Sequence, residues 1–224
     1  MTKSAGVARS PRLIHARTSE EGRMTTIAVL GTGNIGGTLA RKWVAAGHEV
    51  TLGTRDPEKA SVRDLAQELG VSPTPLADAP ARADVVLFAV PGAAMQDTIS
   101  HIGAGLDGKI VIDASNNVAA AVAHSADAIS AAAPSALYYR AFNTLGWELF
   151  ADPAVGGVQA DHFFCGVEGP SREVVEQLIA DVGLRPICVG GPEEAGVVDA
   201  MLRIWLTLAM KRGYGRHIAF KLLT

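Results

Sequence analysis

The chain has 224 residues, of which 48% are hydrophobic and 19% are charged, and its formal net charge is −3. This composition predicts a folded globular protein with one substantial core rather than a disordered chain. Lysines and arginines form no basic stripe and no apolar run approaches the roughly 20 residues that span a bilayer, so we expect neither a nucleic-acid partner nor a membrane segment.

Residues 1–23 mix Arg, Lys, Ser, Gly and Pro without apolar periodicity, which predicts a disordered leader. Met24 directly precedes the first apolar run, so an over-long start assignment also explains this segment. Cys165 and Cys188 lie in apolar runs without CxxC spacing, which favours buried reduced thiols and a cytoplasmic location. No cluster of His and Cys has metal-ligand spacing, so we expect no metal.

From Thr25 onward, short apolar runs alternate with helical stretches, which predicts β-α-β units and a parallel sheet. We expect strands at residues 25–30, 48–54, 83–90, 108–115, 136–142, 161–167 and 185–191, with 71–80 as a connection or a short edge strand. We expect helices at residues 34–46, 56–69, 95–102, 119–133 and 171–181, and a long apolar helix from about residue 192, buried in the core or against a partner subunit. The fold class is therefore α/β, a doubly wound parallel sheet of the Rossmann type followed, beyond a boundary near Gly146, by a small C-terminal α/β domain.

Gly31, Gly33 and Gly36 form a G-x-G-x-x-G motif between the first strand and the first helix. In this context Gly31 permits a tight turn, Gly33 lets the backbone approach a pyrophosphate, and Gly36 lets the helix pack closely on the sheet. The N-terminus of the helix supplies N–H groups and a partial positive charge for the phosphates. The motif therefore predicts a dinucleotide site.

The end of the second strand indicates which dinucleotide binds. Asp56 lies at about the distance where NAD-binding chains place an acidic residue, but it precedes Pro57, where capping of the next helix explains it. Thr54, Arg55 and Lys59 offer a hydroxyl, a guanidinium and an ammonium, which suit a 2′-phosphate. We therefore expect NADP(H).

A nicotinamide should lie beyond the carboxyl ends of the central strands. Three turns fall at such ends and are the candidate walls of a redox centre: Val90-Pro91-Gly92, Ser115-Asn116-Asn117 and Asn143-Thr144-Leu145. Transfer of a hydride between two bound cofactors needs positioning more than acid–base help, so we expect no dedicated catalytic side chain.

Four stretches together resemble the coenzyme F420-dependent NADP oxidoreductase family, whose members pass a hydride between NADPH and a deazaflavin. They are GTGNIGGTLARKW with AAGHEVTLGTRDPEK, AFNTLGWELFADP, GLRP, and LTLAMKRGYGRHIAFKLL. The resemblance covers the chain from about Met24 onward. It implies an NADP-binding Rossmann domain at residues 24–145 and a C-terminal domain at 146–224 that closes the acceptor pocket and takes part in self-association as a homodimer or a higher homo-oligomer.

The resemblance also implies roles for individual residues. The pyrophosphate would lie against Thr32, Gly33, Asn34 and Ile35, and the 2′-phosphate against Thr54, Arg55 and Lys59. Val90, next to Pro91, and Asn116 would flank the nicotinamide, while Asn143, Thr144, Leu145 and Trp147 would face the ring or the acceptor. The chain departs from related archaeal enzymes by having Gly92 where they carry an aromatic residue and Asn143 where they carry a histidine.

The leading hypothesis is therefore an NADPH:F420 oxidoreductase whose partners are small-molecule redox cofactors. Candidate cations for the acidic tail of the acceptor are Arg140, Lys211, Arg212 and Arg216. A second hypothesis is reduction of a small carbonyl or imine, which would need a proton source among Asp113, Tyr138, Tyr139 and His162. A third is a non-catalytic NADP-binding sensor whose long C-terminal helix contacts a partner.

Overall fold

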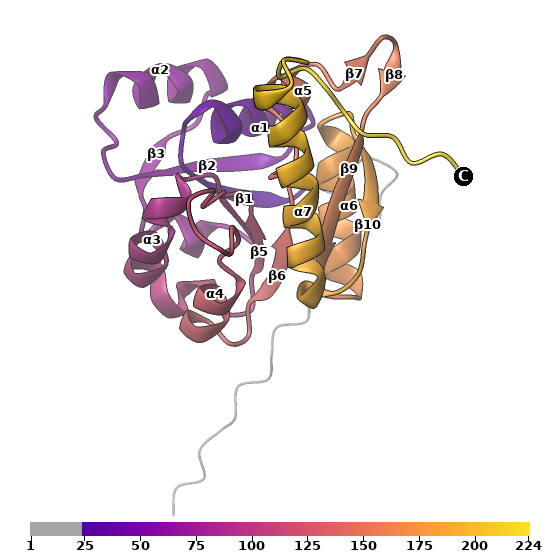
Figure 1. The fold of residues 1–224 in the computed structure, drawn as a ribbon. Coiled ribbons are helices and arrows are strands. Elements are labelled where there is room, and N and C mark those ends of the chain that lie inside the picture. Colours follow the sequence, from indigo (N-terminus) through magenta and orange to yellow (C-terminus); the bar gives the residue numbers. More distant parts are fainter. Residues whose placement is uncertain (1–23) are drawn as a thin grey trace, which may run out of the picture.

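The computed structural model describes residues 24–224 (Figure 1), so the predicted leader at 1–23 lies outside the described residues. One sheet of eight strands runs in the order β10-β9-β6-β5-β4-β1-β2-β3. Its strands are β1 (Thr26–Leu30), β2 (Glu49–Thr54), β3 (Pro73–Pro75), β4 (Val85–Phe88), β5 (Ile110–Asp113), β6 (Leu137–Arg140), β9 (Asp161–Gly166) and β10 (Arg185–Cys188). All neighbours in this sheet pair in parallel except β6 and β9, which are antiparallel. The predicted α/β fold with a doubly wound, mainly parallel sheet is confirmed.

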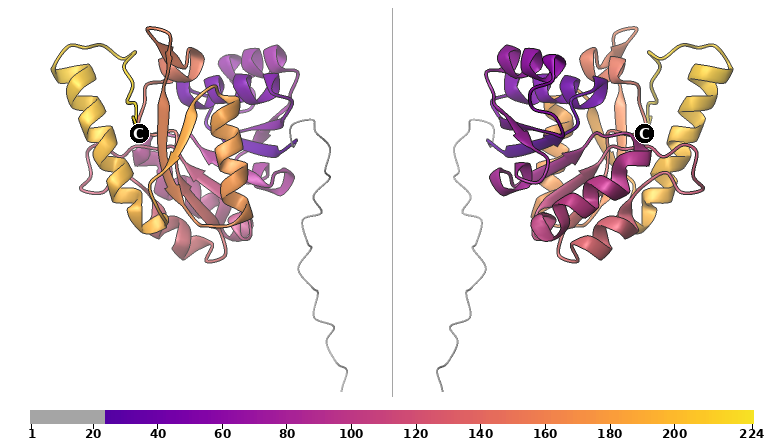
Figure 2. Two further views of the ribbon diagram at one scale, coloured as in Figure 1. Left: turned by 90° about the vertical axis from the view of Figure 1, so that its right-hand side faces the viewer. Right: turned by 90° about the vertical axis from the view of Figure 1, so that its left-hand side faces the viewer.

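Helices cover both faces of this sheet (Figures 1 and 2). They are α1 (Asn34–Ala45), α2 (Ala60–Leu69), α3 (Met95–Ile102), α4 (Ala126–Ala132), α5 (Trp147–Ala151), α6 (Pro170–Asp181) and α7 (Ala195–Leu206), which continues as a π-helical turn at Thr207–Lys211. Short 3-10 turns lie at Ala79–Arg82, Gly92–Ala94, Gly103–Leu106 and Pro192–Glu194. Side chains of α1, α2 and α6 join one core cluster, whereas those of α3, α4 and the start of α7 join the other.

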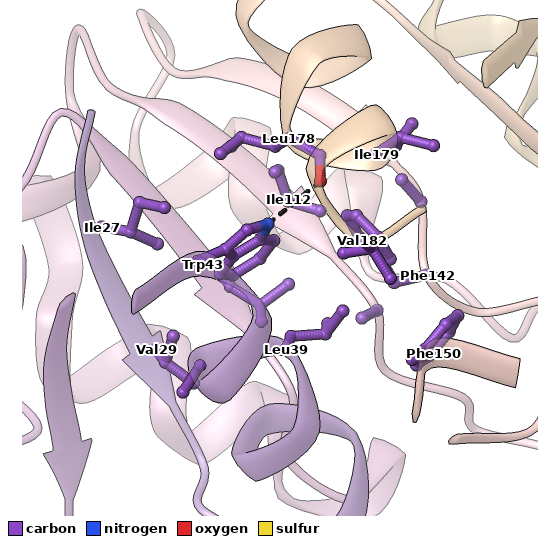
Figure 3. Close-up of a cluster of buried hydrophobic side chains, with 14 of the residues drawn as sticks. Ile27, Val29, Leu39, Trp43, Ile112, Phe142, Phe150, Leu178, Ile179 and Val182 are labelled. Atoms are coloured by element: carbon purple, nitrogen blue, oxygen red, sulfur yellow. Dashed lines mark hydrogen bonds between the residues drawn. The ribbon is translucent and has the colours of Figure 1, made fainter. Parts of the chain in front are cut away.

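Trp43 of α1 lies at the centre of the first cluster and is fully buried (Figure 3). Its indole N–H donates to the backbone oxygen of Leu178 on α6 at 3.0 Å, and its ring meets Phe142 edge to face with the centroids 5.6 Å apart. An indole N–H needs such a partner when it is buried. This contact joins the first helix of the chain to the region beyond residue 146, whose strands β9 and β10 extend the same sheet.

Several predicted elements have different bounds in the structure. The helix predicted at 119–133 is reduced to α4, because the loop before it is fixed by long-range bonds: Ser125 N donates to the Asp113 carboxylate at 2.8 Å, and Arg203 donates to Ala121 O at 3.0 Å. Asp56 caps no helix, since α2 begins only at Ala60. The sequence analysis did not predict α5 or the hairpin of β7 (Ala154–Val155) and β8 (Val158–Gln159).

Candidate functional site

The turn between β1 and α1 has the backbone geometry that the glycine motif predicts. Gly31 has a φ of +103°, and a Cβ there would lie 2.5 Å from the Ala89 carbonyl oxygen, so only glycine fits. A Cβ on Gly36 would overlap the Gly31 carbonyl oxygen, which makes this position a packing contact between helix and turn. A Cβ on Gly33 would meet no atom within 4 Å. The space in front of Gly33 is therefore open for a ligand to approach the backbone.

The N-terminus of α1 faces this open space without a competing anion. Gly33 is the N-cap, it provides no side-chain hydrogen bond, and the first turn holds no acidic residue. The first N–H groups of a helix have no partner inside the helix and carry a partial positive charge. This end of α1 is therefore suited to bind a phosphate.

A cavity of about 650 Å³ lies along the carboxyl ends of β1, β2, β4 and β5. Its lining includes fifteen residues that were named from the sequence as candidates for the site: Gly31, Thr32, Gly33, Asn34, Ile35, Thr54, Arg55, Lys59, Val90, Pro91, Gly92, Ser115, Asn116, Trp147 and Arg216. In an open α/β sheet, ligands bind at this edge, where the strand order reverses. The structure thus brings the glycine turn, the end of β2 and the turns after β4 and β5 around one space.

The end of β2 forms a cationic lip, defined here as Thr54, Arg55 and Lys59. Arg55 and Lys59 are exposed, and neither takes part in an ion pair within residues 24–224. The Asp56 carboxylate accepts the backbone N–H of Glu58 at 3.1 Å, and the Asp56 N–H donates to the Thr54 hydroxyl at 3.2 Å. Asp56 also lines the cavity, with one carboxylate oxygen engaged in its own turn, and Arg55 and Lys59 are available to meet an anion.

Sequence reasoning missed part of the wall next to this lip. Val62 of α2 and Leu76, which follows β3, also line the cavity. Apolar side chains beside a cationic lip provide a surface on which a flat ring can pack. The proline-rich segment around β3 gave no signal of this, because its position at the sheet edge depends on pairing with β2.

Two turns meet backbone to backbone at the other end of the cavity. A Cβ on Gly92 would lie 2.5 Å from both the carbonyl carbon of Asn116 and the Cα of Asn117. A larger residue at position 92 would therefore displace the turn that carries Asn116. This close approach explains why a glycine follows Pro91 in this chain.

The turn after β6 does not lie where the sequence analysis expected it. Asn143, Thr144 and Leu145 are buried, with exposed fractions of 1%, 1% and 5%, and none of them lines the cavity. Of the four residues expected to face the ring or the acceptor, the structure brings only Trp147 to the cavity. Asn143 lies behind the wall, where its backbone oxygen accepts from the Asn116 side chain at 2.9 Å.

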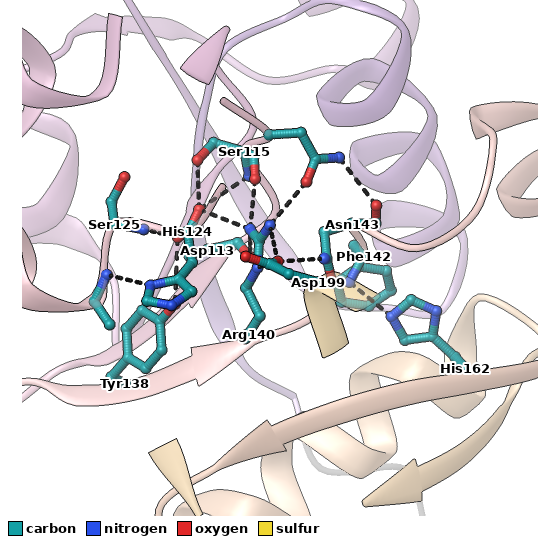
Figure 4. A network of polar contacts seen from close by, with 12 residues as sticks. Asp113, Ser115, His124, Ser125, Tyr138, Arg140, Phe142, Asn143, His162 and Asp199 are labelled. Atoms are coloured by element: carbon teal, nitrogen blue, oxygen red, sulfur yellow. Dashed lines mark hydrogen bonds and ion pairs between the residues drawn. The ribbon is translucent and has the colours of Figure 1, made fainter. Parts of the chain in front are cut away.

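Arg140 was expected to be a cation for the acceptor's tail, and this expectation is wrong. Its side chain has no exposed surface, and it forms an ion pair with Asp199 of α7 at 2.7 Å (Figure 4). It also donates to the backbone oxygens of Asp113 and Ser115. Arg140 therefore belongs to a buried network behind the cavity. Lys211 and Arg212 are exposed and do not line the cavity.

Arg216 does line the cavity, beside Trp147. Its Nε donates to Glu148 Oε1 at 2.6 Å, and its guanidinium lies 5.2 Å from the centroid of the Trp205 ring. A stacked and paired guanidinium is held in one orientation. This end of the cavity is therefore lined by α5 and the C-terminal segment, with Trp205 of α7 supporting Arg216.

None of the four candidate proton sources lines the cavity. Burial, followed by the nearby Asp113 carboxylate, raises the pKa of Tyr138 well above its usual value, and burial also raises the pKa of Tyr139. Burial lowers the pKa of His162 to about 3. Asp113 accepts hydrogen bonds from Ser115 and from Ser125 N. The four side chains serve the internal structure rather than the cavity.

Within residues 24–224 there is no group of three or more His, Cys, Asp or Glu side chains that could hold a metal ion. No helix in the same range is long and apolar enough to cross a membrane.

Comparisons with known proteins agree with this geometry. The family model for coenzyme F420-dependent NADP oxidoreductases matches residues 26–117. The F420-dependent NADP reductase of Methanothermobacter thermautotrophicus is 30% identical over 208 residues, which cover 83% of this chain and 89% of that protein. A solved structure of a candidate F420-dependent NADP reductase from Arthrobacter sp. FB24 is 29% identical, has a TM-score of 0.78, and is matched over 89% of this chain and 100% of its own. The chain belongs to the family of coenzyme F420-dependent NADP oxidoreductases.

Proposed function

We propose that the protein is an oxidoreductase that transfers a hydride between NADPH and coenzyme F420, with the accompanying proton exchanged with solvent. One observation carries this proposal: the glycine turn, the cationic lip and the turns after β4 and β5 share a single cavity. The family membership supports the same pair of cofactors.

The residues of the cavity fit NADPH from one end to the other. The N–H groups at the start of α1 would hold the pyrophosphate in front of Gly33, and Thr54, Arg55 and Lys59 would hold the 2′-phosphate. Val90 and Asn116 would flank the nicotinamide ring, which supplies the hydride when it is bound. The cation pair at the end of β2 favours the phosphorylated coenzyme, because the neighbouring Asp56 carboxylate already accepts the backbone N–H of Glu58 through one of its oxygens.

The chain contributes to the reaction by positioning. Hydride transfer between two rings requires contact distance, fixed orientation and exclusion of water rather than an acid or a base. The burial of Asp113, Tyr138, Tyr139 and His162 away from the cavity fits such a reaction and disfavours reduction of a carbonyl or an imine. We propose that residues 146–224 form the acceptor side, since Trp147 and Arg216 are the lining residues that they contribute.

The decisive experiment mixes purified protein with NADPH and oxidised coenzyme F420 and follows the loss of deazaflavin absorbance. We expect turnover with NADPH and much weaker turnover with NADH at the same concentration. A parallel reaction with a panel of small carbonyls and imines should show no NADPH oxidation. Tight NADPH binding without reduction of coenzyme F420 would refute the proposed acceptor.

We also propose that the protein forms a homo-oligomer. Val197 and Ile204 lie seven positions apart on α7, hence on one face of the helix, and are 50% and 48% exposed. Val118 and Val122 are 64% and 54% exposed in the loop that Arg203 of α7 holds through Ala121 O. Light scattering should detect a homo-oligomer that Ile204→Glu dissociates, and a monomeric wild-type protein would contradict this proposal.

A cytoplasmic location is the last part of the proposal. Both cysteines are free thiols, and burial raises the pKa of the Cys165 thiol to about 12. A protein without disulfides and with an inert buried thiol suits a reducing compartment. Fractionation of the source cells should recover the protein with the cytoplasmic fraction, and recovery elsewhere would contradict this.

A further inference from the structure

The side chain of Asn116 is held at both of its polar atoms. Its Oδ1 accepts from Nη2 of Arg140 at 2.8 Å, and its Nδ2 donates to the backbone oxygen of Asn143 at 2.9 Å. An asparagine amide has two N–H groups and two oxygen lone pairs, so one of each is left for a ligand. Asn116 lines the cavity next to Ser115, and the family resemblance places Asn116 beside the nicotinamide.

Arg140 is in turn fixed by a residue from a distant part of the chain. Its Nε and Nη2 donate to the same oxygen of Asp199 at 2.9 and 2.7 Å, although the two residues are 59 positions apart. Its Nη1 donates to the backbone oxygens of Asp113 and Ser115, the residues that lead into Asn116 (Figure 4). The planar guanidinium thus bridges α7, the end of β5 and the turn that carries Asn116.

A buried ion pair of this kind contributes little to stability. The cost of removing both charges from water offsets most of their attraction, and apolar residues of the same volume would often stabilise the fold as well or better. The planar guanidinium of Arg140 does fix the directions of its hydrogen bonds, which the ammonium group of a lysine at the same place would not do. The arrangement is therefore better explained by the group that it orients than by stability.

We propose that Arg140 and Asp199 are positioning residues that hold Asn116 against the nicotinamide end of bound NADPH. This inference rests on the proposed function insofar as it assumes NADPH in the cavity, and it does not depend on the identity of the acceptor. Neither side chain touches the coenzyme. Both act through the orientation of the Asn116 amide and of the backbone at Ser115.

The test compares two ligands that share the 2′-phosphate end. NADPH carries the nicotinamide, whereas 2′,5′-ADP lacks it, so their ratio of affinities isolates the redox end. Asp199→Asn keeps the shape of the side chain and removes its charge. We expect this variant to weaken the affinity for NADPH about tenfold, which is the effect of one misaligned hydrogen bond, and to leave the affinity for 2′,5′-ADP unchanged. Asn116→Ala should shift the ratio similarly, and the double variant should add nothing to the larger single effect.

Two further variants distinguish a change in positioning from a general loss of folding. Arg140→Lys keeps the positive charge but cannot reach Asp199 and Asn116 together, so it should shift the ratio in the same way. Asp181→Asn is the control. Asp181 pairs with His48 at 2.8 Å and neither residue lines the cavity, so this variant should leave the ratio of affinities unchanged.

The outcomes separate this inference from the proposed function. Equal losses for both ligands, or additive effects in the double variant, would overturn it. A shifted ratio in a protein that does not reduce coenzyme F420 would support the positioning role and refute the acceptor. Failure of the wild-type protein to bind NADPH would overturn both.

Discussion

His162 should make the fold sensitive to mild acid. It is fully buried on β9, and its Nε2 accepts the backbone N–H of Phe142 at 2.6 Å. Phe142 has a φ of 59° and is the only non-glycine residue with a positive φ within residues 24–224. A ring nitrogen that accepts an N–H cannot also carry a proton, so this contact requires a neutral imidazole. Burial accordingly lowers the pKa of His162 to about 3.

The size of the effect follows from the two states of the histidine. In the unfolded chain the ordinary histidine pKa is about 6.5, so below that pH the unfolded state binds a proton that the folded state does not. The free energy of unfolding therefore falls as the pH falls, by up to about 1.4 kcal/mol per pH unit. Between pH 7 and pH 5 the loss from this one side chain is about 2 kcal/mol. It stops growing below pH 3, where the folded state is protonated too.

Urea unfolding of the wild type and of His162→Gln at pH 7 and pH 5 measures this loss. Glutamine can accept the Phe142 N–H through its amide oxygen and does not titrate. We expect the wild type to lose about 2 kcal/mol more than the variant between the two pH values. His101→Gln, a control on the exposed side of α3, should behave as the wild type does. Equal losses in the wild type and in His162→Gln would refute the reasoning.

Three other predictions follow from the cavity and the core. Arg55→Ala should weaken the affinity for NADPH about 10- to 100-fold and the affinity for NADH hardly at all, because it removes a charge-assisted bond to the 2′-phosphate. The control is Arg63→Ala, since Arg63 lies nearby and does not line the cavity. Equal losses of affinity for both coenzymes would contradict the role of the cationic lip. Gly33→Ala should fold normally but bind NADPH at least tenfold more weakly in calorimetry, because its Cβ would enter the space open to the ligand. Gly36→Ala should instead lower the free energy of unfolding by about 1–3 kcal/mol, because its Cβ would overlap the backbone. The reverse pattern would contradict the ligand role of Gly33 and the packing role of Gly36. Asp161→Ala should cost about 1–3 kcal/mol in urea unfolding, because the buried carboxylate pairs with two cations, and an unchanged midpoint would contradict this.

The sequence was sufficient for the parts of the fold that local chemistry determines. The apolar run before Gly31 and the open position at Gly33 each follow from residues within a few positions of one another. The cationic lip is equally local, since Thr54 and Arg55 end the strand and Lys59 precedes the next helix. These features agree with the prediction because no distant partner decides them.

The sequence was not sufficient where a distant strand or helix decides burial. Asn143 follows a strand end in the same way as Asn116 does, yet only Asn116 reaches the cavity. The turn that carries Asn143 is fixed instead by β9, which pairs with β6 in antiparallel orientation and whose His162 accepts the backbone N–H of Phe142. Arg140 looks like a surface cation until α7 places Asp199 against it. No spacing of residues in the sequence indicates that these pairs form.

The two ends of the cavity are therefore built on different principles. One end is lined by residues between Gly31 and Lys59, whereas the other combines turns after separate strands with Trp147 and Arg216. Changes at Asp199 of α7 should consequently alter the wall at Ser115 and Asn116 and spare the lining from Gly31 to Lys59, because Arg140 and Asn143 join Asp199 to that wall.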